Sequence, residues 1–162
     1  MTMLATPAAN VAALLKSREQ TVVVSESSAG GLISAALLAV PGASAYYLGG
    51  GVIYTREARR ILLDIPDDEV RHLTPLTTDY VARCAQALRA KLGATWAVAE
   101  IGTTGPTGSR YGHPAGMCAL AVDGPVTLTR LIENAGHDRE KNMWAFAAAA
   151  LALLEEAMTA AG

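Results

Sequence analysis

Two segments, far apart in the chain, each join a short apolar or β-branched run to a loop rich in glycine and hydroxyl residues. Residues 21–24 lead into residues 25–31, Ser-Glu-Ser-Ser-Ala-Gly-Gly, and residues 94–101 lead into residues 102–108, Gly-Thr-Thr-Gly-Pro-Thr-Gly. Short runs of this kind are typical of buried strands. In an open α/β sheet, ligands bind beyond the carboxyl ends of the strands, where helix N-termini present free N–H groups. The chain therefore predicts a ligand site between these two loops.

The remaining segments alternate between helical and extended patterns. A helix over residues 77–91 is indicated by Thr77 or Thr78 as N-cap and by Gly93 just past its end. Further helices are predicted over residues 4–15, 32–40, 56–63 and 138–159, and further strands over residues 46–54, 115–122 and 126–133. No linker or internal repeat divides this pattern. We therefore expect one α/β domain over residues 1–162, with helices covering a mixed sheet.

The composition excludes several classes of protein. Hydrophobic residues make up 51% and charged residues 17% of the 162 residues, which excludes a disordered chain. The formal net charge is −2 and there is no basic tract, which argues against nucleic-acid binding. Aromatic residues make up only 5%, so few rings are available for stacking on a ligand. A ligand would then be held mainly by backbone N–H groups, hydroxyls and arginines.

Neither a metal site nor a membrane segment is expected. Cys84 and Cys118 lie far apart, the chain has 3 histidines and no Cys-x-x-Cys pair, and a structural zinc site is therefore not indicated. The first seven residues lack the charged and apolar regions of a signal peptide. The apolar run over residues 144–154 is too short to span a bilayer and is followed by Glu155 and Glu156. We predict a cytoplasmic protein with a small-molecule ligand and no nucleic-acid or membrane partner.

Self-association is a further expectation. The helical segments are rich in alanine, and Tyr46 and Tyr47 begin one of the predicted strands. The two tyrosines fit either packing within the fold or a contact surface between copies of the chain, and the alanine-rich helices also suit such a surface. We therefore predict a homo-oligomer.

The first loop presents two hydroxyl groups, those of Ser27 and Ser28, at a turn from strand to helix. Such a turn can hold a hydroxyl both exposed and rigidly aimed. The loop is not a phosphate-binding loop of the Gly-Lys-Ser/Thr type, a Gly-x-Gly-x-x-Gly fingerprint or a Gly-x-Ser-x-Gly elbow. By this pattern alone, the two serines fit a helix cap as well as a nucleophile or an anion site.

Five short motifs occur in order along the chain. They are Glu-Ser-Ser-Ala-Gly-Gly (26–31), Pro-Gly-Ala-Ser-Ala (41–45), Gly-Val-Ile-Tyr-Thr-Arg-Glu-Ala-Arg (51–59), Gly-Thr-Thr-Gly-Pro-Thr-Gly (102–108) and His-Pro-Ala-Gly (113–116). They resemble the Glu-Ser-Cys-Thr-Gly-Gly, Pro-Gly-Ser-Ser, Gly-Val-Val-Tyr-Ser-Asn-Glu-Ala-Lys, Gly-Ile-Ala-Gly-Pro-x-Gly and Lys-Pro-Val-Gly motifs of the CinA C-terminal-domain family. Asp138 and Arg139 stand where that family has Gly-Asp-Arg before its last helix.

The resemblance implies a three-layer α/β/α sandwich with a mixed sheet that hydrolyses the carboxamide of nicotinamide mononucleotide. The products would be nicotinic acid mononucleotide and ammonia, and no cofactor would be needed. Carried over residue by residue, the family's motifs imply a catalytic site with Ser27 as the nucleophile, together with Tyr54 and the position of Arg59. They imply a substrate-binding role for Glu26, Ser28, Gly30, Gly31, Ser44, Thr103, Thr104, Gly105 and Arg139.

The chain departs from the family's pattern at the position of the base. The family has a lysine that takes the proton of the serine, and this chain has Arg59 there. A desolvated lysine can act as a base because burial lowers its pKa, whereas a guanidinium keeps its proton at any working pH. Further departures near the expected site are Ala29, Ile101, His113 and Met143.

Three hypotheses follow from this departure. The chain is an amidase with a rearranged base, for which Glu26, Tyr54, His113 and His137 are the available groups. Alternatively, it binds a mononucleotide or another phosphate ligand without hydrolysing it, with Arg59 as a phosphate clamp. In the third hypothesis it is a structural or partner-binding domain with a vestigial pocket.

Overall fold

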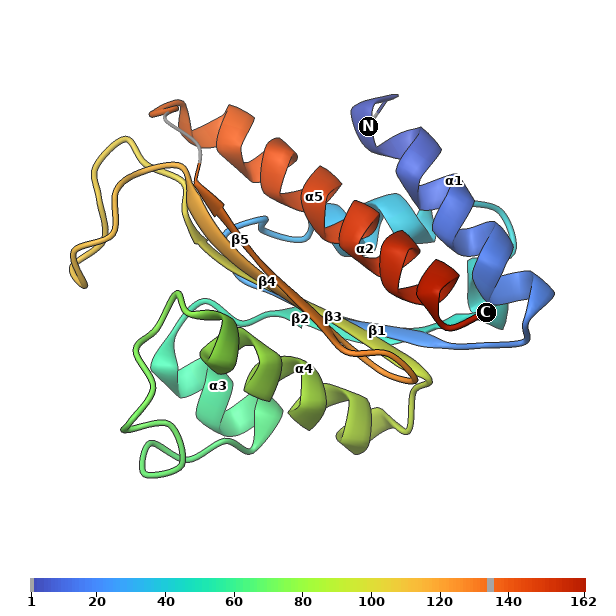
Figure 1. Ribbon diagram of the computed structural model, residues 1–162, viewed down its shortest axis with the longest axis horizontal. Coiled ribbons are helices and arrows are strands. Elements are labelled where there is room, and N and C mark those ends of the chain that lie inside the picture. The colour runs from blue at the N-terminus through green and yellow to red at the C-terminus, as the bar shows by residue number, and fades with distance from the viewer. Residues whose placement is uncertain (1, 134–135) are drawn as a thin grey trace.

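The computed structural model describes residues 2–133 and 136–162, and within them the chain forms a five-stranded sheet with strand order β2-β1-β3-β4-β5 (Figure 1). β1 pairs in parallel with both β2 and β3, whereas β4 pairs antiparallel with β3 and with β5. The sheet is therefore mixed, as predicted. The strands are β1 (Val22–Glu26), β2 (Tyr47–Val52), β3 (Trp96–Thr103), β4 (Met117–Asp123) and β5 (Leu128–Glu133).

Helices cover both faces of this sheet (Figure 1). Helices α1 (Thr2–Ser17), α2 (Leu32–Leu38) and α5 (Arg139–Ala160) lie on one face, and α3 (Arg56–Leu63) and α4 (Thr78–Leu92) lie on the other. A single 3-10 turn, η1 (Ala43–Ala45), precedes β2. The three-layer α/β/α sandwich is thus confirmed.

Two apolar cores lie on opposite faces of the sheet. Alternate residues of a strand point to opposite faces, so Trp96 and Val98 of β3 join the core under α1, α2 and α5. Their neighbours Ala97 and Ala99 join the core under α4. The strand residues on that second face are mostly alanines, and their small side chains let α4 pack close to the sheet.

The ends of the helices follow the local signals in the sequence. The Thr77 hydroxyl accepts a hydrogen bond from the Tyr80 amide, and Gly93 ends α4 with a φ of 65°, a left-handed conformation that glycine adopts without strain. Helix α3 has the predicted bounds, and α5 begins one residue after the predicted start. Helix α2 ends at Leu38, two residues before the predicted end.

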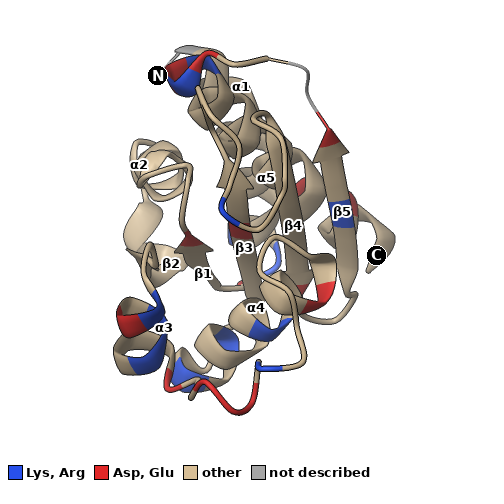
Figure 2. Cartoon of the chain, turned by 90° about the vertical axis from the view of Figure 1, so that its left-hand side faces the viewer, with Lys and Arg blue, Asp and Glu red and all other residues tan. Residues whose placement is uncertain are grey.

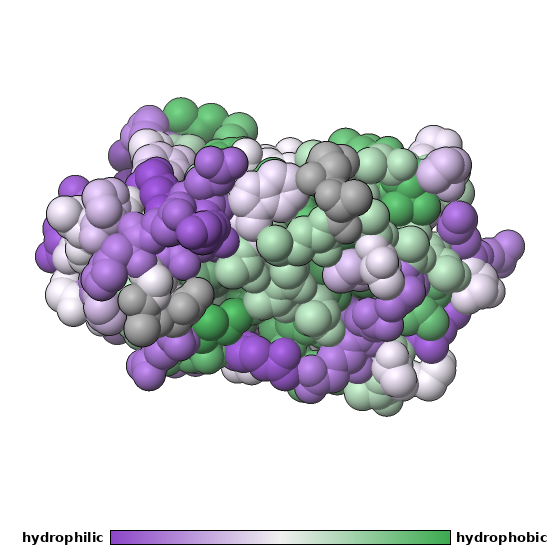
Figure 3. All heavy atoms as spheres, turned by 90° about the horizontal axis from the view of Figure 1, so that it is seen from above, coloured by the Kyte–Doolittle hydropathy of each residue, from purple (hydrophilic) through white to green (hydrophobic). Residues whose placement is uncertain are grey.

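Helix α5 is the one helix, in the part of the chain described, that is long and apolar enough to cross a membrane by length and composition alone. In the fold it packs along the sheet beside α1 and α2 (Figure 1). The surface over α1 and α5 mixes weakly apolar with hydrophilic side chains (Figure 3). This packing is that of a core helix, in which apolar side chains are covered by the sheet.

Candidate active site

The parallel pairing of β1 and β3 brings the two glycine-bearing loops together. Ser25 near the end of β1 lies opposite Ala99 of β3, so the chain that follows each strand leaves the sheet at the same edge. The turn that carries Ser27 and Ser28 therefore lies beside Glu100 and Gly102 of β3 and the loop that follows Thr103. The two loops singled out in the sequence thus lie together at one edge of the sheet.

Glu100, which was not predicted as a site residue, holds the serine turn in place. Its carboxylate accepts hydrogen bonds from the backbone N–H of Ser27 (3.0 Å) and of Ala29 (2.8 Å), and from the hydroxyl of Ser28. The Cys118 thiol lies 3.7 Å from the same carboxylate. Burial raises the pKa of Glu100, and the hydrogen bonds from Ser28, Ala29 and Ser27 partly oppose that shift. The signal in the sequence was a single acidic residue inside an otherwise apolar strand.

Glu26, at the end of β1, contacts the start of α2. Its side chain is fully buried, and its carboxylate accepts hydrogen bonds from the backbone N–H of Gly31 (3.0 Å), Ile33 (3.1 Å) and Ser34 (3.0 Å) and from the Ser34 hydroxyl (2.5 Å). These N–H groups belong to the first turn of α2 and have no partner within the helix. Glu26 therefore caps α2.

Two adjoining cavities open at the edge of the sheet where the loops meet. The larger has a volume of about 570 Å³ and lies toward α3 and α4, and the smaller, of about 320 Å³, lies toward the loop after β3 and the start of α5. Both are lined by Ser27, Tyr54, Ile101, Arg110 and Tyr111. Ser27 and its neighbours thus stand at the junction of the two cavities.

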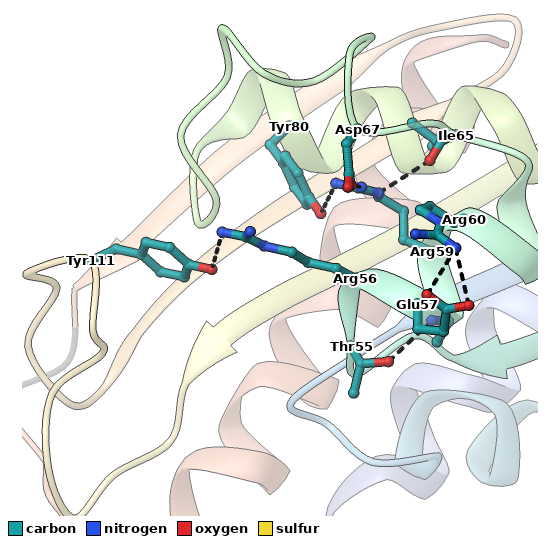
Figure 4. A network of polar contacts seen from close by, with 10 residues as sticks. Thr55, Arg56, Glu57, Arg59, Arg60, Ile65, Asp67, Tyr80 and Tyr111 are labelled. Carbon is teal, nitrogen blue, oxygen red and sulfur yellow. Dashed lines mark hydrogen bonds and ion pairs between the residues drawn. The ribbon is translucent and has the colours of Figure 1, made fainter.

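Arg59 lies in the wall of the larger cavity, where its guanidinium is already paired (Figure 4). Nη2 forms an ion pair with Asp67, Nε donates to the Ile65 carbonyl (3.2 Å) and Nη1 donates to the Tyr80 hydroxyl (3.4 Å). The residue is 4% exposed. The Arg59 guanidinium therefore ties α3 to the segment that follows it and to α4.

Two other arginines at this site are not neutralised by carboxylates. In the part of the chain that the structure describes, neither Arg56 nor Arg110 forms an ion pair. The Arg56 guanidinium donates to the Tyr111 hydroxyl (3.5 Å), and that of Arg110 lies 5.2 Å from the centre of the Tyr111 ring. Burial raises the pKa of Tyr111, but hydrogen bonds and charge from Arg56 and Arg110 outweigh it and lower the pKa. Basic residues also mark α3, the loop after β3 and the start of α5 in Figure 2.

Helix α5 fixes the loop that follows β3. Arg139 donates from Nη1 to the Gly105 carbonyl (2.8 Å) and from Nη2 to the Tyr54 hydroxyl (3.3 Å). Asn142 donates to the Thr104 carbonyl (2.9 Å). The Thr103 hydroxyl is buried and, among the described residues, has no hydrogen-bond partner. Thr103 lines the smaller cavity, although its hydroxyl oxygen is itself buried.

Most of the residues implied by the family's motifs lie together at this site. Ser27, Tyr54 and Arg59 line the larger cavity, and the smaller one is lined by Ser27, Ser28, Tyr54, Thr103, Thr104, Gly105 and Arg139. The residues that line neither cavity are Glu26, Gly30, Gly31, Ser44, His113 and His137.

The residues outside the cavities have visible roles elsewhere or lie on the surface. Gly30 and Gly31 have φ angles of 67° and 99°, so they shape the turn into α2. Ser44 is exposed on η1. His137 is exposed, and a ring nitrogen of His113 lies 3.3 Å from the Pro75 carbonyl. Within residues 2–133 and 136–162, no group of three or more His, Cys, Asp or Glu side chains could hold a metal ion.

Comparison with known proteins agrees with the motifs. The model of the CinA C-terminal domain matches residues 4–158. A CinA-like protein of Parasynechococcus marenigrum is 38% identical over 132 residues, which are 82% of this chain and 32% of the relative. A CinA-like protein of Prochlorococcus marinus strain MIT 9313 is 40% identical over 118 residues, 73% of this chain and 28% of the relative. The matched segments thus span about a third or less of these relatives' length.

Solved structures show the same fold over nearly the whole chain. A CinA superfamily protein from Klebsiella pneumoniae 700603 superposes with a TM-score of 0.90 at 26% identity, covering 97% of this chain and 98% of that one. The competence damage-inducible protein A from Klebsiella pneumoniae MGH 78578 gives a TM-score of 0.89 at 30% identity, covering 96% and 97%. Motifs, family model and fold therefore agree, and the chain belongs to the CinA C-terminal domain family.

Proposed function

We propose that this chain is a serine amidohydrolase that cleaves the carboxamide of a phosphate-bearing nucleotide. Nicotinamide mononucleotide is the substrate that the family resemblance implies, and its products would be nicotinic acid mononucleotide and ammonia. The observation that carries the proposal is the pair of hydroxyls of Ser27 and Ser28, one of them hydrogen-bonded to the buried carboxylate of Glu100, at the junction of two cavities. Amide hydrolysis through a serine needs a hydroxyl and a proton acceptor in contact, and the serine turn supplies the hydroxyl while β3 supplies the acceptor, Glu100.

The charge of the site supports a phosphate-bearing substrate. Arg56, Arg110 and Arg139 line the two cavities, and guanidinium groups bind phosphate oxygens through paired N–H donors. Thr103 adds a buried hydroxyl that has no partner among the described residues. A ligand held by these groups needs no aromatic stacking, in keeping with the 5% aromatic content.

The cysteines support a cytoplasmic location as part of the same proposal. Cys84 and Cys118 are free and buried. Burial raises the pKa of Cys84 to about 11 and that of Cys118 well above its usual range, so both stay protonated near neutral pH. Unpaired thiols of this kind fit a reducing compartment.

Ammonia release from nicotinamide mononucleotide, coupled to reductive amination of 2-oxoglutarate, tests the proposal. Nicotinamide riboside is the matched substrate, since it carries the same carboxamide and lacks the phosphate. We expect hydrolysis of the mononucleotide and a kcat/KM lower by at least about tenfold for the riboside, a loss equivalent to about 1.4 kcal/mol of phosphate contacts. The double variant Ser27→Ala/Ser28→Ala, which lacks both candidate nucleophiles, is the negative control, called the blank below.

Two negative outcomes separate the competing hypotheses. If the wild-type chain releases no more ammonia than the blank but binds the mononucleotide in calorimetry, it is a nucleotide-binding protein without hydrolytic activity. If it neither hydrolyses nor binds the mononucleotide, the amidase proposal is wrong and a structural role is favoured.

A further inference from the structure

The two neighbouring serines of the turn have different hydrogen-bond partners. Within residues 2–133 and 136–162, the Ser27 hydroxyl forms no hydrogen bond, and only its backbone N–H reaches Glu100. The Ser28 hydroxyl, in contrast, donates to Oε1 of Glu100. Of the two candidate nucleophiles, Ser28 is the one in contact with a group that can accept its proton.

Both members of this pair border the cavities. Ser28 lines the smaller cavity and Glu100 lines the larger one, while the two side chains are otherwise buried, Ser28 being 6% and Glu100 2% exposed. Gly102 leaves the space that Ser28 occupies, because a Cβ at that position would lie 2.8 Å from the Ser28 hydroxyl oxygen and 2.7 Å from the Phe146 ring. Gly102, near the end of β3, is thus required for this placement of the hydroxyl.

Arg59, the lysines and two of the histidines are engaged or lie outside the cavities. Arg59 is an acid at every working pH and is paired with Asp67. The lysines line neither cavity: Lys16 donates to the Pro41 carbonyl, Lys91 pairs with Asp64, and Lys141 pairs with Asp138. His113 and His137 also line neither cavity.

We infer that Ser28 supplies the attacking hydroxyl and that Glu100 is its general base, an assignment that rests on the proposed amide hydrolysis. The Ser28 oxygen forms a bond to the carboxamide carbon while its proton moves to Glu100. The tetrahedral intermediate then collapses, the C–N bond breaks, and the proton on Glu100 passes to the leaving nitrogen, which departs as ammonia. Water attacks the resulting ester, gives one proton to Glu100, and releases the carboxylic acid while that proton returns to the Ser28 oxygen.

This role requires that Glu100 be ionised in the free enzyme. Burial raises its pKa, and the nearby Glu26 on β1 acts in the same direction. The titratable groups that share the larger cavity with it are Tyr54, Arg56, Glu57, Arg59, Tyr80, Cys84, Arg110 and Tyr111. The Cys118 thiol on β4 donates toward Oε1. The rate should therefore fall on acidification at a pH above the ordinary pKa of a glutamic acid.

Ser28→Ala and Ser27→Ala form a matched pair that tests the assignment in the ammonia assay. We expect Ser28→Ala to lower kcat by at least about 1,000-fold and Ser27→Ala to lower it by less than about tenfold. The reverse order would overturn the assignment of Ser28 and leave amide hydrolysis intact. Absence of activity in the wild-type chain would instead contradict the proposed function itself.

Glu100→Gln tests the base separately. The amide oxygen can still accept from the backbone N–H of Ser27 and Ala29, so we expect a folded protein, checked by circular dichroism and thermal melting. The expected result is a kcat lower by about 100- to 10,000-fold, with KM changed far less. The acidic limb of the kcat/KM profile should also vanish. A Glu100→Gln protein that keeps this limb, or keeps its kcat within tenfold, would exclude Glu100 as the base.

Discussion

Arg59 stands where the family's motif has lysine, and its surroundings account for a guanidinium at that position. The side chain is buried and reaches three groups in different directions: Asp67, the Ile65 carbonyl and the Tyr80 hydroxyl. The planar guanidinium of arginine has five N–H donors and can bond to all three groups, whereas the ammonium of lysine is a single point charge. We therefore interpret Arg59 as a structural residue that holds α3 to the segment after it and to α4. The proton acceptor is then Glu100 of β3.

Arg59→Lys tests this interpretation at the scale of one residue. We expect the free energy of unfolding to fall by about 1–3 kcal/mol, because buried partners lose hydrogen bonds to a charged group. Ammonia release should not increase. Urea denaturation and the ammonia assay measure the two effects. A gain of tenfold or more in kcat would mean that the site lacks only a lysine, and would contradict Glu100 as the base.

The residues of the site were predictable to different degrees. Ser27, Tyr54 and Arg139 follow from short motifs, since each motif lies in one stretch of chain. Glu100 was missed because its contacts with Ser28 depend on the register of β1 against β3, which the sequence does not display. An acidic residue in an apolar strand was the available signal, as a buried charge needs partners.

Among the elements, the two edge strands of the sheet differ in how they are protected. β5 carries Arg130 and Glu133, and charged side chains on an edge strand hinder pairing with another chain. β2, with the sequence Tyr-Leu-Gly-Gly-Gly-Val, carries no charge, and its Leu48 and Val52 are each 45% exposed. We therefore expect the predicted homo-oligomer to form through β2.

Leu48→Lys disrupts this edge, and Leu131→Lys on β5 is its control, because Leu131 is also 45% exposed. We expect the wild-type chain and Leu131→Lys to elute as dimers and Leu48→Lys to elute as a monomer. Size-exclusion chromatography with light scattering gives the mass. Monomeric wild-type protein at every concentration, or dissociation by Leu131→Lys alone, would show that β2 is not the interface.

The helices and strands were predicted with unequal accuracy, for a physical reason. Helix ends are encoded locally by caps such as Thr77 and Gly93, and the predicted ends of α3, α4 and α5 lie within two residues of those found. β3 begins and ends two residues later than predicted. Its last residues are glycine and threonine, which join the sheet because Gly102 and Thr103 pair with Cys118 and Met117 of β4. Pairing with a distant strand overrides the local preference of a glycine for a loop.

At the scale of the whole molecule, the topology of the sheet creates the site. β1 and β3 are adjacent and parallel, so their ends bring the serine turn and the glycine-rich loop to one edge. Helix α5, from the other end of the chain, holds that loop through Arg139 and Asn142. The site therefore depends on segments from the N-terminal, middle and C-terminal parts of the chain, and local disruption of any of them should weaken it.

Trapping the covalent intermediate would identify the nucleophile directly. The wild-type protein is quenched with acid during turnover of nicotinamide mononucleotide, digested, and searched by tandem mass spectrometry for an ester of the nucleotide's carboxyl group. We predict that the ester is found on Ser28, within the turn over residues 25–31. An ester on Ser27, or only unmodified peptide from this turn during steady hydrolysis, would contradict the assignment of Ser28 as the nucleophile.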